Sequence, residues 1–410
     1  MSSLANTVDL GSVEPARSRH AGRRSTVAVG PDTVVVGTAD GTVRAFERDS
    51  LTQRWRVASA SDHGDDPSVV SAAICDGTVI VGERSALGRI RGYDLVTGEC
   101  RFRSETADDI GSPTKETRFF LPFVVDIETA GGRVYVAARR YERDAGERSF
   151  ESVIYAVDPG GTVRWRYRTD ASPISLDASE DRIAVAYNRC PGEYQHGLAI
   201  LDADSGDERW HWDPGTEGQR RVGDVSLLSD GVAVASHGDY RGYRLDPSGA
   251  VRWQADLATP QQIGDETLYA YPNHVHATEH GVLFVTGNTY AEESRETDAL
   301  HPDEHTVSGY APRGTQRWEA DIGGFATGVD TDGDTVAVPS AQHFRSRDPD
   351  GHGLSTFDVA SGSLLTTKTD GVVTATALDG TELVAVEEPV SYHDDDRTHG
   401  RYRLHREDAV

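Results

Sequence analysis

The chain has 410 residues, and its 67 Asp and Glu residues outnumber its 41 Lys and Arg residues, which leaves a formal net charge of -26. A surface this anionic repels nucleic-acid phosphates and anionic lipid, so we expect neither nucleic acid nor membrane as a partner. No apolar run approaches the ~20 residues of a membrane-spanning helix, so the sequence does not predict a membrane-spanning protein.

Nearly all of the positive charge is arginine, because Lys115 and Lys368 are the only lysines. An acidic, lysine-poor composition is typical of extreme halophiles, whose molar cytosolic salt screens charges over ~3 Å. We therefore expect a halophilic source. The alternative is an ordinary acidic protein encoded by a GC-rich genome.

The three cysteines are far apart in the sequence, and none of them forms a C-x-x-C pair: Cys75, Cys100 and Cys190. Their number and spacing predict neither a disulfide framework nor a cysteine metal site. Twin arginines at residues 23–24 resemble part of an export signal, but Gly, Pro and Asp at residues 30–32 interrupt the apolar stretch that follows. We interpret the arginine pair as the entrance to a strand and expect a cytoplasmic protein.

From residue 34 onward the chain repeats one pattern of short strands and turns. Each copy runs from an apolar strand through a variable link to a strand that ends in Asp. A Ser-Gly or Pro-Gly turn then leads into a strand that usually carries Trp. The eight copies occupy residues 34–55, 79–102, 134–165, 183–210, 232–253, 282–318, 336–368 and 383–406.

The strands of each copy alternate polar and apolar residues with a period of 2, as in Thr42–Phe46, which is typical of half-buried strands. With the short strand that leads into each copy through an Asp-Gly turn, every copy supplies four antiparallel strands, which is one blade of a β-propeller. No segment sustains a 3.6-residue apolar period, so a helical solenoid is excluded. The sequence predicts an all-β fold, an eight-bladed β-propeller of four-stranded antiparallel blades in a single domain, residues 1–410.

The succession of V-x-V-G, A-h-D-x-x-[ST]-G and x-x-W resembles the PQQ-like, or quinoprotein-type, β-propeller repeat family over almost the whole chain. In that family the tryptophan docks one blade against the next, so the resemblance implies a structural role for the residues at this position. They are Trp55, Trp165, Trp210, Trp253 and Trp318, with Phe102 and Leu365 as replacements in copies two and seven.

The last copy ends without a tryptophan strand, which leaves an edge unpaired. Residues 5–12, "ANTVDLGS", have the length and pattern of an outer strand. We expect them to complete the eighth blade, so that the N-terminal strand closes the ring. The alternative is a disordered leader.

The links between the second and third strands differ from copy to copy, and a site is expected where a repeat varies. Antiparallel geometry places these links and the connections between copies on one face, which we expect to bind a protein partner or a small ligand. The long segments are residues 104–123, 139–152, 188–197, 257–277, 288–308 and 340–353.

Histidine and tyrosine are frequent in these long segments. His274 and His276 lie two residues apart on an expected innermost strand, so their side chains point to the same side and form a tentative transition-metal site. A ring of histidines from several blades is compatible with a metal or a tetrapyrrole, including haem. The alternative is that these histidines are solvated loop residues with one hydrogen-bonded pair. Other histidines in or near the links are His196, His237, His301, His305, His343, His352, His393 and His399.

The family resemblance raises the question of a quinone-dependent dehydrogenase. In such members PQQ is held above a disulfide of adjacent cysteines and beside a calcium site, within a longer chain. This sequence has no adjacent cysteines, and its Asp-Gly segments such as residues 330–335 lack the distal Glu of a calcium loop. There is no P-loop, no G-x-S-x-G and no H-E-x-x-H.

We therefore expect a monomeric, non-catalytic β-propeller scaffold without a cofactor. The first alternative is a propeller that binds a metal or a tetrapyrrole through histidines. A PQQ-dependent oxidoreductase comes third.

Overall fold

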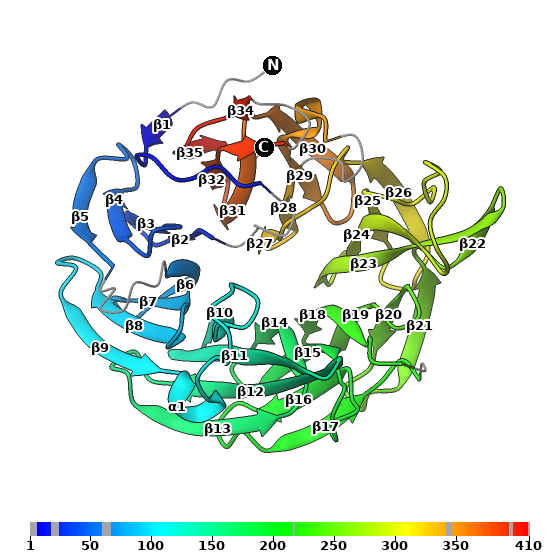
Figure 1. Cartoon of the computed structure of the whole chain (residues 1–410), viewed down its shortest axis with the longest axis horizontal. Helices are drawn as coiled ribbons and strands as arrows, with labels where there is room; N and C mark the ends of the chain where they lie inside the picture. Colours follow the sequence, from blue (N-terminus) through cyan, green and yellow to red (C-terminus); the bar gives the residue numbers. More distant parts are fainter. Residues whose placement is uncertain are drawn as a thin grey trace. The chain divides into compact units, whose positions relative to one another are not determined.

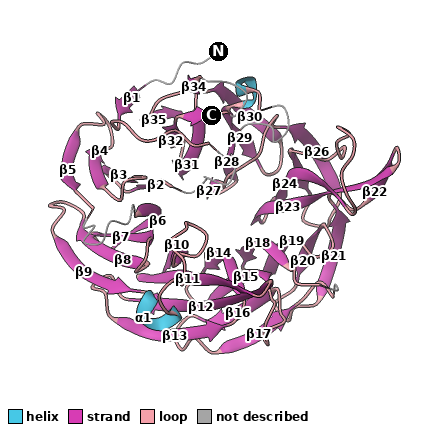
Figure 2. Ribbon diagram, in the orientation of Figure 1, coloured by secondary structure: helices cyan, strands magenta, loops and turns pink. Residues whose placement is uncertain are grey.

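The computed structural model describes residues 6–17, 24–59, 67–215, 218–341, 347–392 and 397–408. Strands dominate, and within these ranges the helical segments are α1 (Ala107–Ile110) and a 3-10 turn, Pro349–Gly351 (Figure 2). The chain divides into a central unit, residues 23–213, and a terminal unit, residues 1–22 with 214–410. The predicted all-β class and its four-stranded antiparallel sheets are confirmed.

In its described residues the central unit contains sixteen strands that follow one another along the chain in groups of four (Figure 1). Each group is an antiparallel meander, and β7 and β10 also pair at Arg84 and Phe123, which joins the second and third groups. The strands are β2 (Thr26–Val29), β3 (Thr33–Gly37), β4 (Val43–Glu47), β5 (Gln53–Val57), β6 (Ser68–Cys75), β7 (Thr78–Arg84), β8 (Arg89–Asp94), β9 (Cys100–Glu105), β10 (Phe123–Ala130), β11 (Arg133–Asp144), β12 (Glu147–Val157), β13 (Val163–Thr169), β14 (Ser172–Ala178), β15 (Arg182–Arg189), β16 (Leu198–Asp202) and β17 (Glu208–Trp212).

The terminal unit repeats the meander, with one sheet enlarged to five strands by β22. Two short strands also pair outside the sheets, β33 (Val390–Ser391) with β34 (Thr398–His399). The other strands are β18 (Val222–Leu228), β19 (Gly231–Ser236), β20 (Arg241–Leu245), β21 (Val251–Asp256), β22 (Gln261–Ile263), β23 (Glu266–Thr278), β24 (Gly281–Ala291), β25 (Thr306–Tyr310), β26 (Gln316–Asp321), β27 (Asp330–Asp332), β28 (Thr335–Ser340), β29 (Gly353–Asp358), β30 (Gly362–Lys368), β31 (Val372–Asp379), β32 (Glu382–Glu388), β35 (Arg403–Asp408) and β1 (Asn6–Asp9).

The core lies between neighbouring sheets, where the apolar positions of the alternating strands meet. Val35 and Val43 of the first central sheet pack with Val79 and Val81 of the second in one buried cluster. This face-to-face burial is what the period-2 pattern requires.

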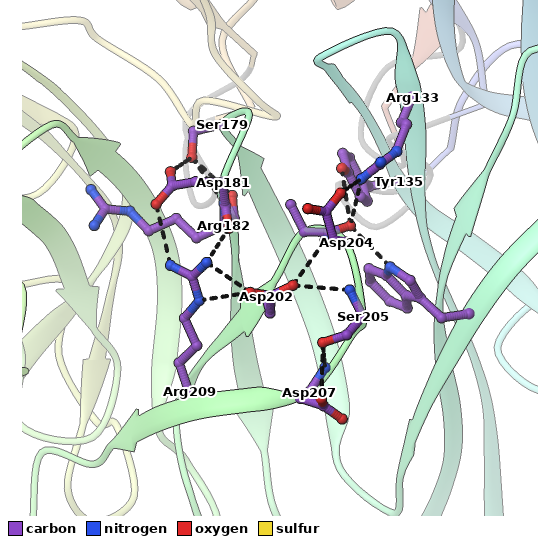
Figure 3. A network of polar contacts seen from close by, with 12 residues as sticks. Arg133, Tyr135, Ser179, Asp181, Arg182, Asp202, Asp204, Ser205, Asp207 and Arg209 are labelled. Atoms are coloured by element: carbon purple, nitrogen blue, oxygen red, sulfur yellow. Dashed lines mark hydrogen bonds and ion pairs between the residues drawn. The ribbon is translucent and has the colours of Figure 1, made fainter.

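The D-x-x-[ST]-G segment of the repeat is a tight turn held by its own aspartate. In the fourth central sheet, Oδ1 of Asp202 accepts hydrogen bonds from the backbone N–H groups of Asp204 and Ser205, each at 2.9 Å (Figure 3). Arg209 donates to the other carboxylate oxygen at 2.8 Å. These bonds, the Arg209 bond foremost, lower the pKa of Asp202 to about 2. The turn therefore explains why aspartate and a small hydroxyl residue recur together.

Of the five tryptophans at the repeat position, four donate their indole N–H to a backbone carbonyl of the following sheet in the same unit. The acceptor lies one or two residues after the next-to-last strand of that sheet, in the turn that leads into its last strand. The pairs are Trp55 with Leu95 (3.0 Å), Trp165 with Ala203 (3.0 Å), Trp253 with Pro312 (3.0 Å) and Trp318 with Val359 (3.2 Å).

The turn glycines lie against these indole rings. A Cβ added to Gly98, Gly206, Gly314 or Gly362 would come within 2.6–3.2 Å of the tryptophan of the preceding sheet. These glycines also have φ between 73° and 99°, which disfavours any side chain. The fifth tryptophan, Trp210, is half-buried on β17 opposite Ile200.

The N-terminal strand pairs with the last strand of the chain. β1 runs antiparallel to β35, with Asn6 opposite Arg406 and Asp9 opposite Arg403. It is thus the outer strand of the sheet β1-β35-β32-β31, as expected for residues 5–12, although residue 5 lies outside the described part of the chain.

Candidate functional site

The most elaborated sheet of the terminal unit is the five-stranded one. Its hairpin of β23 and β24 has 13 and 11 residues, compared with six or fewer in the two strands of β19 and β20. The link that follows β24 folds back onto the hairpin, where Glu266 accepts the backbone N–H of Thr297 at 3.0 Å. The long link at residues 288–308 is therefore an ordered part of this sheet.

Four tyrosines gather at this end of the hairpin and the neighbouring sheet, and we call them the tyrosine surface: Tyr240, Tyr269, Tyr271 and Tyr290. The ring centroids of Tyr240 and Tyr269 are 4.5 Å apart, and those of Tyr271 and Tyr290 are 5.2 Å apart. Tyr269 also contacts Tyr290 at 5.9 Å in a stacked arrangement. All four side chains are half-buried, so each presents part of its ring to solvent.

Tyr240 is held in an unusual backbone conformation. It lies in the turn between β19 and β20 with φ of 64°, a region that non-glycine residues seldom occupy. Its carbonyl oxygen accepts the N–H groups of Leu257 and Ala258 at 3.3 and 3.2 Å, which fixes the turn. Strain of this kind is often found at binding sites. Burial, together with the charge of Tyr271, raises the pKa of Tyr240 to about 12, so its hydroxyl stays neutral at ordinary pH.

Arg220 and His237 complete the tyrosine surface around Tyr271. The Arg220 guanidinium lies 4.7 Å from the Tyr271 ring centroid, which is a cation–π distance, and the His237 ring lies 4.8 Å from it. Gly223 leaves room for this arrangement, since a Cβ there would lie 2.3 Å from Nε2 of His237.

His274 and His276, the tentative metal pair, both lie on β23 and engage protein groups. Nε2 of His276 donates to the carbonyl oxygen of Gly333 at 2.8 Å, and burial lowers the pKa of this imidazole. Nδ1 of His274 lies 3.7 Å from a carboxylate oxygen of Asp224. Within the described residues no three His, Cys, Asp or Glu side chains form a group able to hold a metal ion. The structure therefore adds no further ligand to the pair.

Several link histidines are buried rather than solvated. His301 donates to the carbonyl of Thr259 at 3.0 Å, His305 bonds Asn288 at 2.9 Å, and His352 donates to the carbonyl of Asp370 at 3.0 Å. Each is at most 2% exposed, so the expectation of solvated loop histidines is wrong for these three. Their role is to hold the links in place.

The remaining link histidines that the structure describes contact other rings at separate places. The His196 ring stacks on His211 with centroids 3.4 Å apart in the central unit. His399 lies 5.8 Å from Tyr392 in the terminal unit. His343 and His393 lie outside the described residues.

A recurrent aspartate on first strands escaped the sequence analysis. In three places its Oδ2 accepts a backbone N–H from the next sheet, on β14, β23 or β31. The pairs are Asp126 with Leu176 (2.9 Å), Asp224 with Val275 (2.9 Å) and Asp330 with Leu378 (2.6 Å). The sequence signal is an aspartate within the strand that precedes the turn in these three copies, but its partner lies about fifty residues away.

The donor set for PQQ does not fit. Cys75, Cys100 and Cys190 are all free thiols, so no disulfide of adjacent cysteines is present to support the cofactor. In the described residues, no cluster of three or more acidic side chains is placed so that it could hold a calcium ion. We derive no quinone chemistry for this chain.

Comparison with known proteins agrees with this fold. A family model described as outer membrane protein assembly factor BamB matches residues 16–145 and 125–364. No curated relative matches the chain in sequence. In the described residues, no helical segment has the length and apolar character needed to cross a bilayer.

Solved structures with the same fold include a BamB protein, an alcohol dehydrogenase and a designed protein. BamB from Moraxella catarrhalis is 16% identical, with a TM-score of 0.59 over 94% of this chain and 96% of that one. The quinohemoprotein alcohol dehydrogenase ADHIIG from Pseudomonas putida HK5 is 11% identical, with a TM-score of 0.61 over 98% and 75%. The designed protein Ika8 is 13% identical, with a TM-score of 0.55 over 93% and 97%. At these identities the likeness concerns the fold alone.

Proposed function

We propose that this chain, which belongs to the PQQ-type β-propeller family of the outer membrane protein assembly factor BamB, is a non-catalytic scaffold that binds a protein partner. The observation that carries this proposal is the tyrosine surface with Arg220. Tyrosine and arginine are the residues that most often dominate protein–protein binding energy, because they combine large contact area with polar groups. The half-buried rings are already ordered, which limits the entropy lost on binding.

The family description supports a protein partner. An assembly factor acts on other proteins, and BamB of Moraxella catarrhalis matches this chain over nearly the full length of both. The enzymes of the same fold carry a cofactor whose donor set does not fit here. We therefore place this chain with the scaffolds.

The architecture that we infer for the scaffold is an eight-bladed propeller in one domain. Eight copies of the repeat support the blade count, and the pairing of β1 with β35 supports closure of the ring by the N-terminal strand. The tryptophans that donate to the next sheet fit the docking role that the family resemblance implies.

The setting that we propose is the cytoplasm of a halophile, with the chain as a monomer. The net charge of -26 supports this, because molar salt screens such self-repulsion. The same charge disfavours nucleic acid and anionic membrane as partners.

Site-specific photo-cross-linking tests the proposal in the source cells. A benzophenone amino acid placed at position 290 should cross-link one protein reproducibly, because that ring lies on the tyrosine surface. The matched control places it at Val96, which is 73% exposed in the central unit. Cross-linking of the same proteins from both positions, or of none from position 290, would contradict the proposal.

A further inference from the structure

A second aromatic surface lies in the central unit, and the proposed function does not use it. We call it the phenylalanine surface: Phe119, Phe120 and Tyr141, with Arg84, Lys115 and Arg139. Its residues come from the end of β7, from residues 111–122 and from the long hairpin of β11 and β12 (Figure 1). Residues 111–122 and the tip of the β11–β12 hairpin belong to two of the long segments that vary between repeats.

The rings of this surface form a continuous row on a buried base. Phe120 and Tyr141 have centroids 5.1 Å apart, and Tyr141 and Phe150 are 5.3 Å apart. Phe150 is 4% exposed, so it supports the row from beneath. The row is therefore fixed by packing in the free protein.

Phe119 stands out from the row toward solvent. It is 58% exposed, which is more than any other aromatic side chain in the described part of the chain. An exposed phenylalanine beside other aromatic rings leaves apolar surface in water, and such a patch marks an interaction site.

Cations lie over the rings. The Arg84 guanidinium is 4.6 Å from the Phe123 centroid and 6.0 Å from that of Phe119, and the Lys115 ammonium is 4.6 Å from Phe120. Arg139 lies 5.6 Å from the centroids of both Phe123 and Phe150. The cation–π contacts hold these charges at the aromatic row.

The connection at residues 111–122 has a net positive charge, opposite in sign to that of the chain. One of only two lysines lies here, and residues 111–122 contain Lys115 and Arg118 against the single carboxylate Glu116. The nearby Glu142 is engaged by Arg140 and accepts the backbone N–H of Thr114 at 3.2 Å. A cationic, aromatic surface on a protein of net charge -26 is electrostatically complementary to a negatively charged partner.

We propose that the phenylalanine surface binds an acidic peptide segment that carries an apolar or aromatic side chain. The apolar side chain packs on Phe119 and Phe120, and the flanking carboxylates pair with Arg84, Lys115 and Arg139. A peptide fits better than a nucleic acid, because a phosphate backbone extends well beyond the surface and meets the anionic remainder of the chain.

The test measures fluorescence polarisation of a labelled peptide of Asp and Glu around a central Phe-Phe pair. It uses the full chain at the lowest salt concentration at which circular dichroism shows it folded. Phe119→Ser should weaken binding about fivefold or more, as for loss of an aromatic anchor. Lys115→Glu should weaken binding about tenfold and reduce its salt dependence.

Lys368→Glu is the matched control, because it makes the same change in net charge in the terminal unit, which does not contribute to the phenylalanine surface. It should leave the affinity within about twofold of the parent, since Lys368 is not one of the residues proposed to contact the peptide. Equal losses for the two lysine variants would show a bulk charge effect and overturn the proposal. So would absence of binding, unchanged binding of a peptide in which Ser replaces Phe-Phe, or tighter binding of an oligothymidylate. A failure here leaves the cross-linking result at the tyrosine surface unaffected.

Discussion

The indole N–H of Trp165 donates to the carbonyl oxygen of Ala203 at 3.0 Å, from one sheet of the central unit to the next. The same ring lies against Gly206, at the end of the D-x-x-[ST]-G turn. The tryptophan that ends one copy of the repeat is thus received by the turn of the following copy. In four places the tryptophan of one copy and the turn glycine of the next copy are therefore the two halves of one contact.

Removing the ring should be costly for stability. Trp165→Ala is expected to lower the free energy of unfolding by roughly 3–5 kcal/mol, because it leaves a large cavity between two sheets. Trp165→Phe keeps much of the packing and loses the hydrogen bond, which is worth about 1 kcal/mol. Chemical denaturation followed by circular dichroism measures both values.

The glycine side of the contact provides the control. An alanine at Gly206 would bring its Cβ within 2.6 Å of the Trp165 ring, whereas an alanine at Gly160 would meet nothing within 4 Å. Gly206→Ala should therefore destabilise the protein clearly more than Gly160→Ala. If Gly206→Ala, Gly160→Ala and Trp165→Ala all have similar unfolding midpoints, the contact between Trp165 and Gly206 contributes little to stability.

Asp330 should make stability depend on pH. Burial of its carboxylate raises the pKa to about 7, and the charge of Asp332 acts in the same direction. In the unfolded chain the pKa is about 3.9, so between these values the unfolded state is ionised while the folded state keeps its proton. Unfolding then releases a proton, and stability falls as pH rises through this window.

Asp330→Asn should remove this slope, because the amide oxygen still accepts the Leu378 N–H and carries no proton to lose. Thermal unfolding should show the variant gaining stability relative to the parent as pH rises from about 4 to about 8. Asp332→Asn is the control. By removing the neighbouring charge it should lower the pKa of Asp330 and so narrow the pH range over which stability falls. Parallel pH profiles for the parent and Asp330→Asn would disprove the assignment.

Deleting residues 1–12 should expose the edge of β35. The strand β1 pairs along this edge, and Thr7 is hydrogen-bonded to the buried His405 at 3.0 Å. An unpaired edge strand promotes association, so light scattering should show aggregates that the parent lacks. Deletion of residues 1–5 keeps all of β1 and is the control. A monomeric 1–12 deletion with the parent's unfolding midpoint would rule out the closing role of β1.

The histidine pair on β23 can be tested by metal analysis. We expect protein purified without an affinity tag to contain less than stoichiometric zinc, copper and iron and to show no Soret band, because Nε2 of His276 is engaged by Gly333. Stoichiometric metal or haem that is lost in a variant with both His274→Ala and His276→Ala would instead establish the pair as ligands.

The strands and turns could be predicted because their signals are local. The period-2 pattern, the Asp-Gly turns and the recurring tryptophan each depend on neighbours within a few residues, and the structure places strands at each copy. The D-x-x-[ST]-G turn of Asp202 is likewise complete within its own loop. Such features can be read from the sequence because they do not depend on how the sheets pack.

The surfaces were harder to predict because their residues come from different elements. Tyr269 and Tyr271 share one side of β23 by their spacing of two, but Tyr240 and Tyr290 join them only through sheet packing. The bond from Asp224 to Val275 likewise spans 51 residues. Only the positions of the neighbouring sheets determine such contacts.

The central claim is that the tyrosine surface binds a protein partner. The most direct test is to measure, by calorimetry, the affinity of this chain for the partner that cross-linking identifies. A variant with Tyr269→Ala and Tyr271→Ala should lose about tenfold or more in affinity, as for removal of two interface anchors, while its fold is unchanged by circular dichroism. Val96→Ser should bind like the parent. Equal affinities for the parent and the double tyrosine variant would contradict the account.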